Sequence, residues 1–223
     1  MGKQRKVRNT SIPSKIADSI RDLISRGTLA PDVHLGQMQL AERFGVSRVP
    51  VREALKLLAS EGLVLHDLNR GFFVASLSSD EARQLYRMRH VVEAELLSTI
   101  EWPSKEQLAD LRIRVQELEK LLEDGKRTEW SVRHREFHRV VFNFSPQKIL
   151  IREVLRLWTL TDRYRSLLPS QSKTMEIGGG HSGERALVEC LVKRDRKRLL
   201  EVFDEDRTRV EGMLLGILDA RGL

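Results

Sequence analysis

Residues 40–55 have the sequence LAERFGVSRVPVREAL, which contains the end of one short helix, a tight turn and the start of another. Gly45 is a natural C-terminal stop for the first helix, and Ser47 is a natural N-cap for the second. Pro50 falls in the first turn of the second helix, where its missing N–H costs little. This order predicts a helix-turn-helix whose second helix spans about residues 47–60.

The second helix has an apolar face and a basic face. At 100° per residue, one side collects Val51, Ala54, Leu55 and Leu58. An adjacent side collects Arg48, Val49, Arg52 and Lys56. An arginine fork matches the acceptor edge of guanine, and a helix N-terminus offers N–H groups to phosphate. We therefore expect this helix to enter a major groove, with Ser47 on phosphate and Arg43 facing the DNA backbone; the alternative is a solvated basic face.

The flanking sequence predicts a winged helix. Apolar residues recur at helical spacing over residues 13–26, and a short helix is expected over 37–44. Residues 63–66 and 72–75 have strand patterns, and residues 67–71, DLNRG, form a turn between them. Three helices followed by a β-hairpin make the winged helix-turn-helix layout.

Residues 13–75 resemble the winged-helix domain of the GntR family of bacterial regulators. The matching motif is VSRVPVREAL at 46–55, followed by Leu58, Glu61, Gly62, Leu63 and Val64, and the wing ends RGFFV at 70–74. The resemblance implies that the major groove is read by Ser47, Arg48, Val49, Pro50 and Arg52. It also implies that the wing tip, Asn69, Arg70 and Gly71, lies over the minor groove. The chain departs from the family at three positions. Asp32 replaces a usual turn glycine, Gln37 replaces a usual glutamate, and Val49 replaces a usual threonine.

The pattern after Ser76 is helical throughout. Helices are expected near 80–101, 104–124, 129–144, 147–167, 183–193 and 195–218. Residues 170–180 predict a longer loop, either a plain connector or a lid. The expected fold is thus mainly α, with a basic arm at 1–10, a winged helix-turn-helix at 11–76 and an antiparallel all-α bundle at 77–223.

Residues 80–218 resemble the all-helical, FCD-type effector domain of the FadR-like branch of that family. The landmarks are LYxxRxxxE at 85–93, Phe137-His138, and Ala186-Leu187 leading to Asp195. Members resembling this pattern hold a divalent metal with one Asp and three His. The corresponding positions here are His134, His138, Glu184 and Asp206, an altered set that Zn²⁺, Ni²⁺ or Mn²⁺ would accept. A salt-bridged interior without metal is the alternative, and His181 could replace Glu184.

The resemblance also implies contacts to a small carboxylate effector. Arg89 matches an arginine that faces the effector's carboxylate, although a helical pair with Glu93 competes for it. Gln147 falls where relatives have an asparagine near the pocket. Trp158, Arg163 and Tyr164 are candidates for the pocket lining or for ordinary core.

Composition and spacing exclude several classes of protein. The net charge is +7, of which residues 1–76, with 12 Lys/Arg and 7 Asp/Glu, carry +5. The single cysteine, Cys190, predicts a buried thiol and a cytoplasmic protein, and no apolar run is long enough for a membrane span. Glu136 lies two residues after His134, which is the wrong spacing for a zinc hydrolase, so no enzyme is expected.

Together these observations predict a ligand-responsive regulator of transcription, by default a repressor. One recognition helix covers only a few base pairs, so we expect a homodimer on double-stranded operator DNA with inverted half-sites. The effector is expected to be a small organic acid. The alternative is a DNA-binding dimer whose helical domain serves dimerisation alone.

Overall fold

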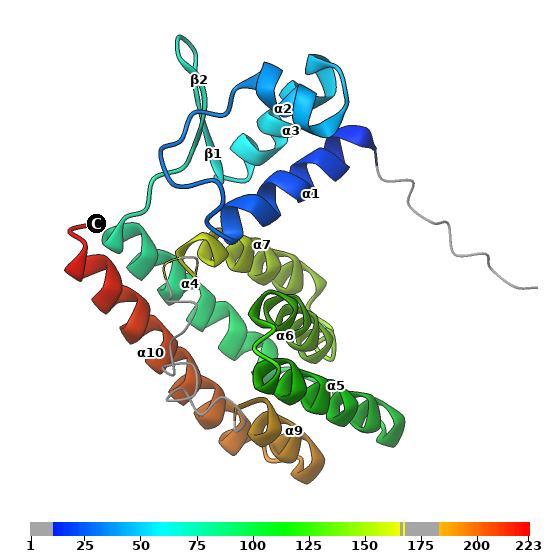
Figure 1. The fold of residues 1–223 in the computed structure, drawn as a ribbon. Helices are drawn as coiled ribbons and strands as arrows, with labels where there is room; N and C mark the ends of the chain where they lie inside the picture. The colour runs from blue at the N-terminus through cyan, green and yellow to red at the C-terminus, as the bar shows by residue number, and fades with distance from the viewer. Residues whose placement is uncertain (1–10, 166, 168–182) are drawn as a thin grey trace, which may run out of the picture. The chain divides into compact units, whose positions relative to one another are not determined.

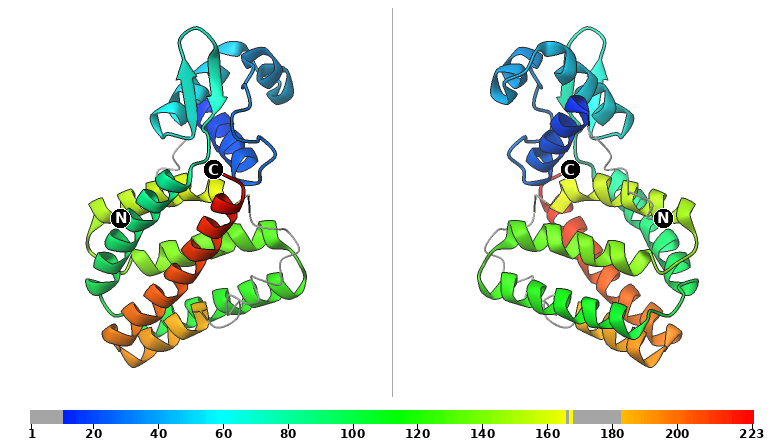
Figure 2. Two further views of the ribbon diagram at one scale, coloured as in Figure 1. Left: turned by 90° about the vertical axis from the view of Figure 1, so that its left-hand side faces the viewer. Right: turned by 90° about the vertical axis from the view of Figure 1, so that its right-hand side faces the viewer.

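A computed structural model describes residues 11–165, 167 and 183–223. The basic arm at 1–10, the loop at 170–180 and His181 lie outside the described residues. The chain divides into two compact units at Leu77 and Ser78 (Figures 1 and 2). Each unit is described by itself.

The first unit is the winged helix that the sequence predicts. It contains α1 (Ile12–Ser25), α2 (Gln37–Phe44), α3 (Arg48–Ser60), β1 (Val64–Asp67) and β2 (Gly71–Val74). The two strands are antiparallel, with Val64 opposite Val74 and Asp67 opposite Gly71, and they form the hairpin in Figure 1. Each strand begins one residue away from its predicted start, because the short DLNRG turn closes on Gly71 as part of the ladder.

The core of this unit comes from one apolar face of each element. α1 packs against α3, and α2 packs against the start of the same helix. The buried side chains on these faces include Ile16, Ile20, Leu40, Val51, Leu55, Leu58, Val64, Phe72 and Val74. Outside this core, Arg21 of α1 donates three hydrogen bonds to Glu61, at 2.7, 2.9 and 3.3 Å, and so ties α1 to the end of α3.

Two turns fix the angles between these helices. Gly45 ends α2 with φ +64°, a left-handed conformation that a residue with a Cβ adopts at a cost. Asp32 has φ +63°, so the chain keeps the left-handed backbone at the position where the family has glycine. The Asp32 carboxylate accepts a hydrogen bond from the Ser76 hydroxyl, which helps to hold this turn.

The second unit is a helical bundle. Its helices are α4 (Ser79–Ser98), α5 (Lys105–Glu123), α6 (Arg127–Phe142), α7 (Lys148–Arg165), α9 (Gly183–Lys193) and α10 (Arg196–Ala220). α4 packs lengthwise against α7 and α10, while α5 packs against α6 and α9 (Figure 1). The fully buried large side chains of its core include Leu96, Leu97, Leu111, Phe137, Phe142 and Trp158. The fold class expected from the sequence is confirmed.

Helix ends in this unit follow local capping. Ser78 and Asp195 cap α4 and α10, and Ser104 forms a capping box with Gln107 at the start of α5. α4 ends at Ser98, three residues before its predicted end, where the Thr99 hydroxyl donates to the carbonyl of Glu95. Local hydrogen bonds of this kind end a helix without a glycine or proline signal.

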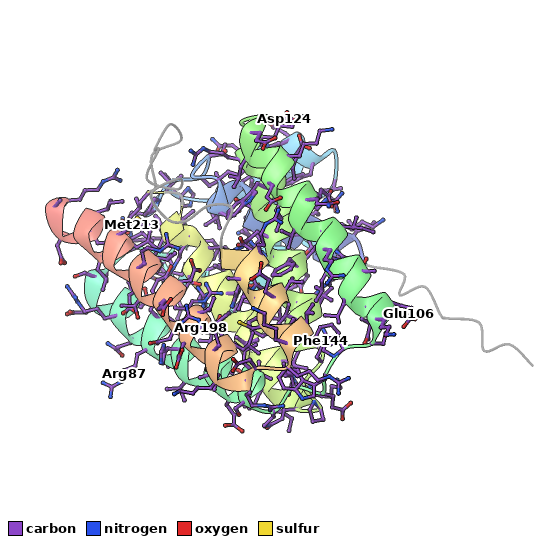
Figure 3. The ribbon with its side chains drawn as sticks, turned by 90° about the horizontal axis from the view of Figure 1, so that it is seen from below. Arg87, Glu106, Asp124, Phe144, Arg198 and Met213 are labelled. Carbon is purple, nitrogen blue, oxygen red and sulfur yellow. The ribbon has the colours of Figure 1, made fainter. Side chains whose placement is uncertain are left out.

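The surface of the bundle is charged. Figure 3 labels Arg87 on α4 and Arg198 on α10, whose side chains lie at the surface. Arg198 pairs with Glu201 and Glu205, each at 3.1 Å. Among the described helices, none combines the length and the apolar character that a membrane span requires.

Candidate functional site

The first candidate site is the exposed face of α3. Arg48, Val49 and Arg52 are exposed and Pro50 is half-buried, whereas Val51, on the opposite face, is fully buried. Arg48 forms no hydrogen bond or ion pair with any residue that the structure describes, and Arg52 only approaches Glu53 at 4.0 Å. The apolar face of the helix is therefore used in folding, while its arginines remain available to a ligand.

The start of α3 is also open. Ser47 is the N-cap, as predicted, but its exposed hydroxyl makes no capping hydrogen bond. The hydroxyl and the first N–H groups of the helix can therefore reach a phosphate. Arg43, in the last turn of α2, is exposed too and forms no hydrogen bond or ion pair within the described part of the chain. The turn between α2 and α3 thus carries the Ser47 hydroxyl, the first N–H groups of α3, and the guanidinium groups of Arg43 and Arg48 on either side.

The hairpin presents its tip in a fixed conformation. The Asp67 carboxylate accepts hydrogen bonds from the N–H groups of Asn69 and Arg70, at 2.8 and 3.0 Å. These backbone N–H groups hold the pKa of Asp67 below its usual value. Arg70 lies over the Phe73 ring, 5.2 Å from its centre, and Gly71 has φ +94°. Asn69 and Arg70 are exposed, as a contact with DNA requires.

The second candidate site is a group of metal-type ligands inside the bundle. His134 and His138, one turn apart on α6, are buried, and their Nε2 atoms lie 3.1 Å apart. Glu184, at the start of α9, places a carboxylate oxygen 3.1 Å from Nε2 of His134. Three donor atoms from two helices thus gather within 4.8 Å of one another.

These three residues fit a divalent cation. Ligand atoms about 2.0–2.2 Å from a tetrahedral Zn²⁺ are separated from each other by roughly 3.3 Å, close to the separations seen here. The imidazoles are also held in place, because His134 stacks on Trp130 at 4.5 Å and His138 lies 5.1 Å from Trp158, centre to centre. Imidazole and carboxylate ligands suit Zn²⁺, Ni²⁺ and Mn²⁺.

Asp206, the fourth predicted ligand, is not part of this group. Its carboxylate pairs with Arg209, one turn further along α10. It lies beside Gly183, where a Cβ would meet its oxygen at 3.6 Å. The Asp206 carboxylate therefore lies next to the start of α9 but pairs with the guanidinium of Arg209 on its own helix.

A buried ion-pair network surrounds Trp158. Glu93 of α4 has no exposed surface, and one of its oxygens accepts hydrogen bonds from Arg89, at 3.1 and 3.3 Å, and from the Trp158 indole. Its other oxygen lies 3.0 Å from Nε of Arg207 on α10. Both guanidinium groups also lie over the Trp158 ring, at 4.6 and 4.8 Å from its centre.

Arg89 is therefore engaged within the chain. Besides Glu93 it donates a hydrogen bond to the hydroxyl of Thr161 on α7, at 2.7 Å. Burial lowers the pKa of Arg89, but the charge of Glu93, its hydrogen bond and the further negative charges nearby together outweigh burial, so the pKa lies above its usual value. The helical pair of Arg89 with Glu93, the alternative that the sequence left open, is present, and it is enclosed rather than on the surface.

Gln147 lies in another part of the bundle. Its side chain donates to Glu95, at 2.9 Å, and to Thr99, at 3.3 Å, near the end of α4. It precedes α7, whereas Thr161, the partner of Arg89, lies 14 residues further along the chain, or about 20 Å at 1.5 Å per residue. The structure does not bring Gln147 and Arg89 to one site.

Other candidates form hydrogen bonds within the chain. Arg163 and Tyr164 of α7 both donate to the Glu81 carboxylate in the first turn of α4. Burial and the hydrogen bond to Glu81 raise the pKa of Tyr164. Cys190 is buried, as predicted, and burial raises the pKa of its thiol.

Sequence reasoning missed Arg207 and Thr161. A pattern signal existed for Arg207, because it lies one helical turn after Phe203 on the face that carries the core. An arginine at such a position needs an internal carboxylate, and Glu93 is that partner. Thr161 carried no signal of its own, since a threonine hydroxyl is satisfied equally well by its own helix.

A cavity of about 280 Å³ lies elsewhere, between α5 and α9. Its lining consists of Arg112, Val115, Gln116, Arg185, Val188, Glu189, Val192 and Lys193. None of these residues belongs to the ligand group or to the ion-pair network, so the cavity is separate from both.

Two family models match the sequence. The model described as "Bacterial regulatory proteins, gntR family" matches residues 13–74, and the FCD domain model matches residues 84–205. The first range contains α3 and the hairpin. The second contains His134, His138 and Glu184 together with Arg89 and Glu93.

Similar proteins are transcriptional regulators. The HTH-type transcriptional repressor GlaR of Escherichia coli K12 is 30% identical over 191 residues, which cover 82% of this chain and 87% of that protein. The uncharacterized regulator YdhC of Bacillus subtilis 168 is 31% identical over 135 residues, which cover 60% of each chain. The structure of E. coli McbR/YncC has the same fold, with a TM-score of 0.82 at 22% identity, covering 92% of this chain and 97% of that one.

Proposed function

Because the chain belongs to the GntR family of bacterial transcriptional regulators and carries an FCD domain, we propose that it is a ligand-responsive repressor that binds its operator as a homodimer. The family binds DNA and is not enzymatic, which agrees with the absence of an enzyme motif in the sequence. GlaR is a repressor, and repression relieved by a ligand is the mode that we propose here. The operator lies in the bacterial cytoplasm, where we place the protein.

The observation that carries the proposal is the free arginine face of α3. Arg48 and Arg52 lie one turn apart, both exposed, and neither is committed to a close internal ion pair among the described residues. Each guanidinium can donate two hydrogen bonds to the O6 and N7 atoms of a guanine, a contact that contributes about 1–3 kcal/mol of discrimination. We propose that Arg43 and Ser47 contact the DNA backbone beside that helix, and that the wing tip, Asn69 to Gly71, lies over the minor groove.

We propose a two-fold symmetric operator. One α3 helix contacts only a few base pairs, so a useful affinity for one site in a genome needs two half-sites. Selection of bound fragments from a pool of random DNA by the full chain tests this. An inverted repeat supports the homodimer; enrichment of a single half-site, or no enrichment of any sequence, contradicts it.

We propose that His134, His138 and Glu184 hold a divalent cation. Two helices meet at this group, so a bound cation would stabilise the bundle as well as the site. When bound, the cation would offer positions to oxygen atoms of an effector. Asp206 would contribute only after leaving Arg209, so we assign the site to the other three residues.

The effector that we propose is a small organic acid, bound inside the bundle with Arg89 as the contact for its carboxylate. Gln147 does not take part in this contact, because it bonds Glu95 and Thr99 in another part of the bundle. A thermal-shift screen of organic acids, with and without Zn²⁺, tests the sensor function, because a ligand that binds only the folded state raises Tm by mass action. If no acid or cation raises Tm, the helical domain serves dimerisation alone.

A further inference from the structure

Among the described residues of the bundle, Glu93 is the most enclosed charged side chain. It has no exposed surface, and it lies where α4, α7 and α10 meet. One of its oxygens accepts hydrogen bonds from Arg89 and from the indole of Trp158, and the other lies in an ion pair 3.0 Å from Nε of Arg207. A buried carboxylate needs such partners, because an isolated one would be strongly destabilised.

The same three donors form a complete recognition site for a carboxylate. Arg89 supplies charge-assisted hydrogen bonds, Arg207 supplies the positive charge of an ion pair, and the indole N–H adds a neutral donor. The guanidinium groups are preorganised, since both are packed over the Trp158 ring. Any carboxylate of the right size that reached this point would find the partners that Glu93 now has.

We propose that Glu93 is a built-in competitor for the effector's carboxylate, so that an acid binds Arg89 only by replacing Glu93 as its partner. This inference rests on the proposed sensing of an organic acid. The exchange is chemically balanced, because one carboxylate replaces another on Arg89, and Glu93 keeps Arg207 and Trp158 as partners.

The competition defines the kind of effector. A tethered carboxylate acts at an effective concentration of about millimolar or higher, so a simple acid present at lower concentration cannot replace it. An effector must therefore gain affinity from a second group that binds elsewhere in the bundle. The class that fits is an acid with a further anchoring group, such as a second carboxylate or a hydroxyl.

The exchange also changes contacts between helices. Arg89 joins α4 to α7 through Thr161, at 2.7 Å. A guanidinium that turns toward an effector gives up this bond together with those to Glu93. Binding would thus alter the α4–α7 contact, which a ligand must do if it is to favour one arrangement of the bundle over another.

Chemical rescue by acetate tests the inference in the full chain. Removing the side chain in Glu93→Ala leaves a cavity beside Arg89, Arg207 and Trp158. We expect its Tm to rise by about 2–4 °C or more in 100 mM sodium acetate relative to sodium chloride at the same ionic strength. The wild type and Glu123→Ala, which removes an exposed carboxylate from the end of α5, should show no difference between the two salts.

If Glu93→Ala does not fold in chloride, refolding yield replaces Tm as the readout, and acetate should restore soluble protein. Glu93→Gln fills the cavity with an uncharged side chain and should not respond to acetate. The inference is overturned if acetate stabilises or rescues Glu93→Ala no better than chloride, or if it raises the Tm of the wild type equally. Operator binding by the wild type is measured in parallel. A wild type that does not bind operator DNA would refute the proposed function, whereas the acetate response tests the role of Glu93 alone.

Discussion

The Nε2 atoms of His134 and His138 lie 3.1 Å apart, and Glu184 brings a carboxylate oxygen to within 3.1 Å of the first of them. Three donors at this spacing are suited to share one cation, and they come from two helices, α6 and α9. Cation binding should therefore be visible as a gain in the stability of the bundle.

We predict that Zn²⁺ raises the Tm of metal-free wild-type protein and that the double variant His134→Ala, His138→Ala loses this response. Loss of two imidazoles leaves only Glu184, which is insufficient for tight binding. Differential scanning fluorimetry with and without EDTA measures the effect, and elemental analysis counts the bound ion. His90→Ala is the control, because His90 is exposed and pairs with Asp204. An unchanged zinc content in the double variant would place the cation elsewhere.

Arg89 and Arg87 form a matched pair on α4, one buried and one exposed. Arg89→Ala leaves the buried Glu93 with one guanidinium fewer, and breaking a buried pair costs about 3–5 kcal/mol. Arg87→Ala should change the free energy of unfolding by less than about 0.5 kcal/mol. Urea unfolding of both variants gives the comparison. Equal stability would show that the ion pair contributes nothing to the fold.

The backbone at Arg194 predicts a stabilising glycine. Arg194 follows α9 with φ +54°, and a left-handed conformation costs a residue with a Cβ about 1–2 kcal/mol. Glycine avoids this cost, but its greater flexibility in the unfolded chain offsets part of the gain in stability. Arg194→Gly should therefore gain roughly 0.5 kcal/mol. Glu189→Gly, inside the same helix, should lose about 1 kcal/mol. Thermal unfolding measures both, and a loss of stability at both positions would be inconsistent with the left-handed conformation.

Asp67 gives the hairpin a pH dependence. Because its pKa is lowered in the folded protein, its stabilising effect is complete above the pKa of the unfolded chain, about 3.9, and is lost as the pH falls through the folded value. Asp67→Ala should therefore lower Tm at pH 7, and the difference from the wild type should shrink as the pH is lowered below about 4. A difference that does not depend on pH would mean that the carboxylate charge is not what holds the turn.

The sequence predicted the first unit nearly completely. The order of Gly45, Ser47 and Pro50 defines the turn and the start of α3, because each has a local backbone requirement. In the second unit the errors were at helix ends, such as Ser98, where a side chain bonds its own helix and no stop residue marks the boundary. Asp32 kept the left-handed turn without glycine, which only the observed φ could establish.

The buried site was less predictable. Helical spacing brought His134 and His138 together, but whether Asp206 joins them depends on Arg209, a competing partner on its own helix. Pairing across helices decided the rest: Arg207 reaches Glu93 from α10, and Gln147 meets Glu95 far from Arg89. Such contacts depend on the register of helices distant in sequence, which no local pattern specifies.

The most direct test of the account is the affinity of α3 variants for the selected operator. We predict that Arg48→Ala and Arg52→Ala each weaken specific binding by about 5- to 150-fold, with unchanged Tm, since both side chains are exposed and outside the core. Arg87→Ala removes the same charge from the other unit and should bind like the wild type. Fluorescence anisotropy at fixed salt gives the three affinities. Wild-type affinity in both α3 variants would show that this helix does not read DNA.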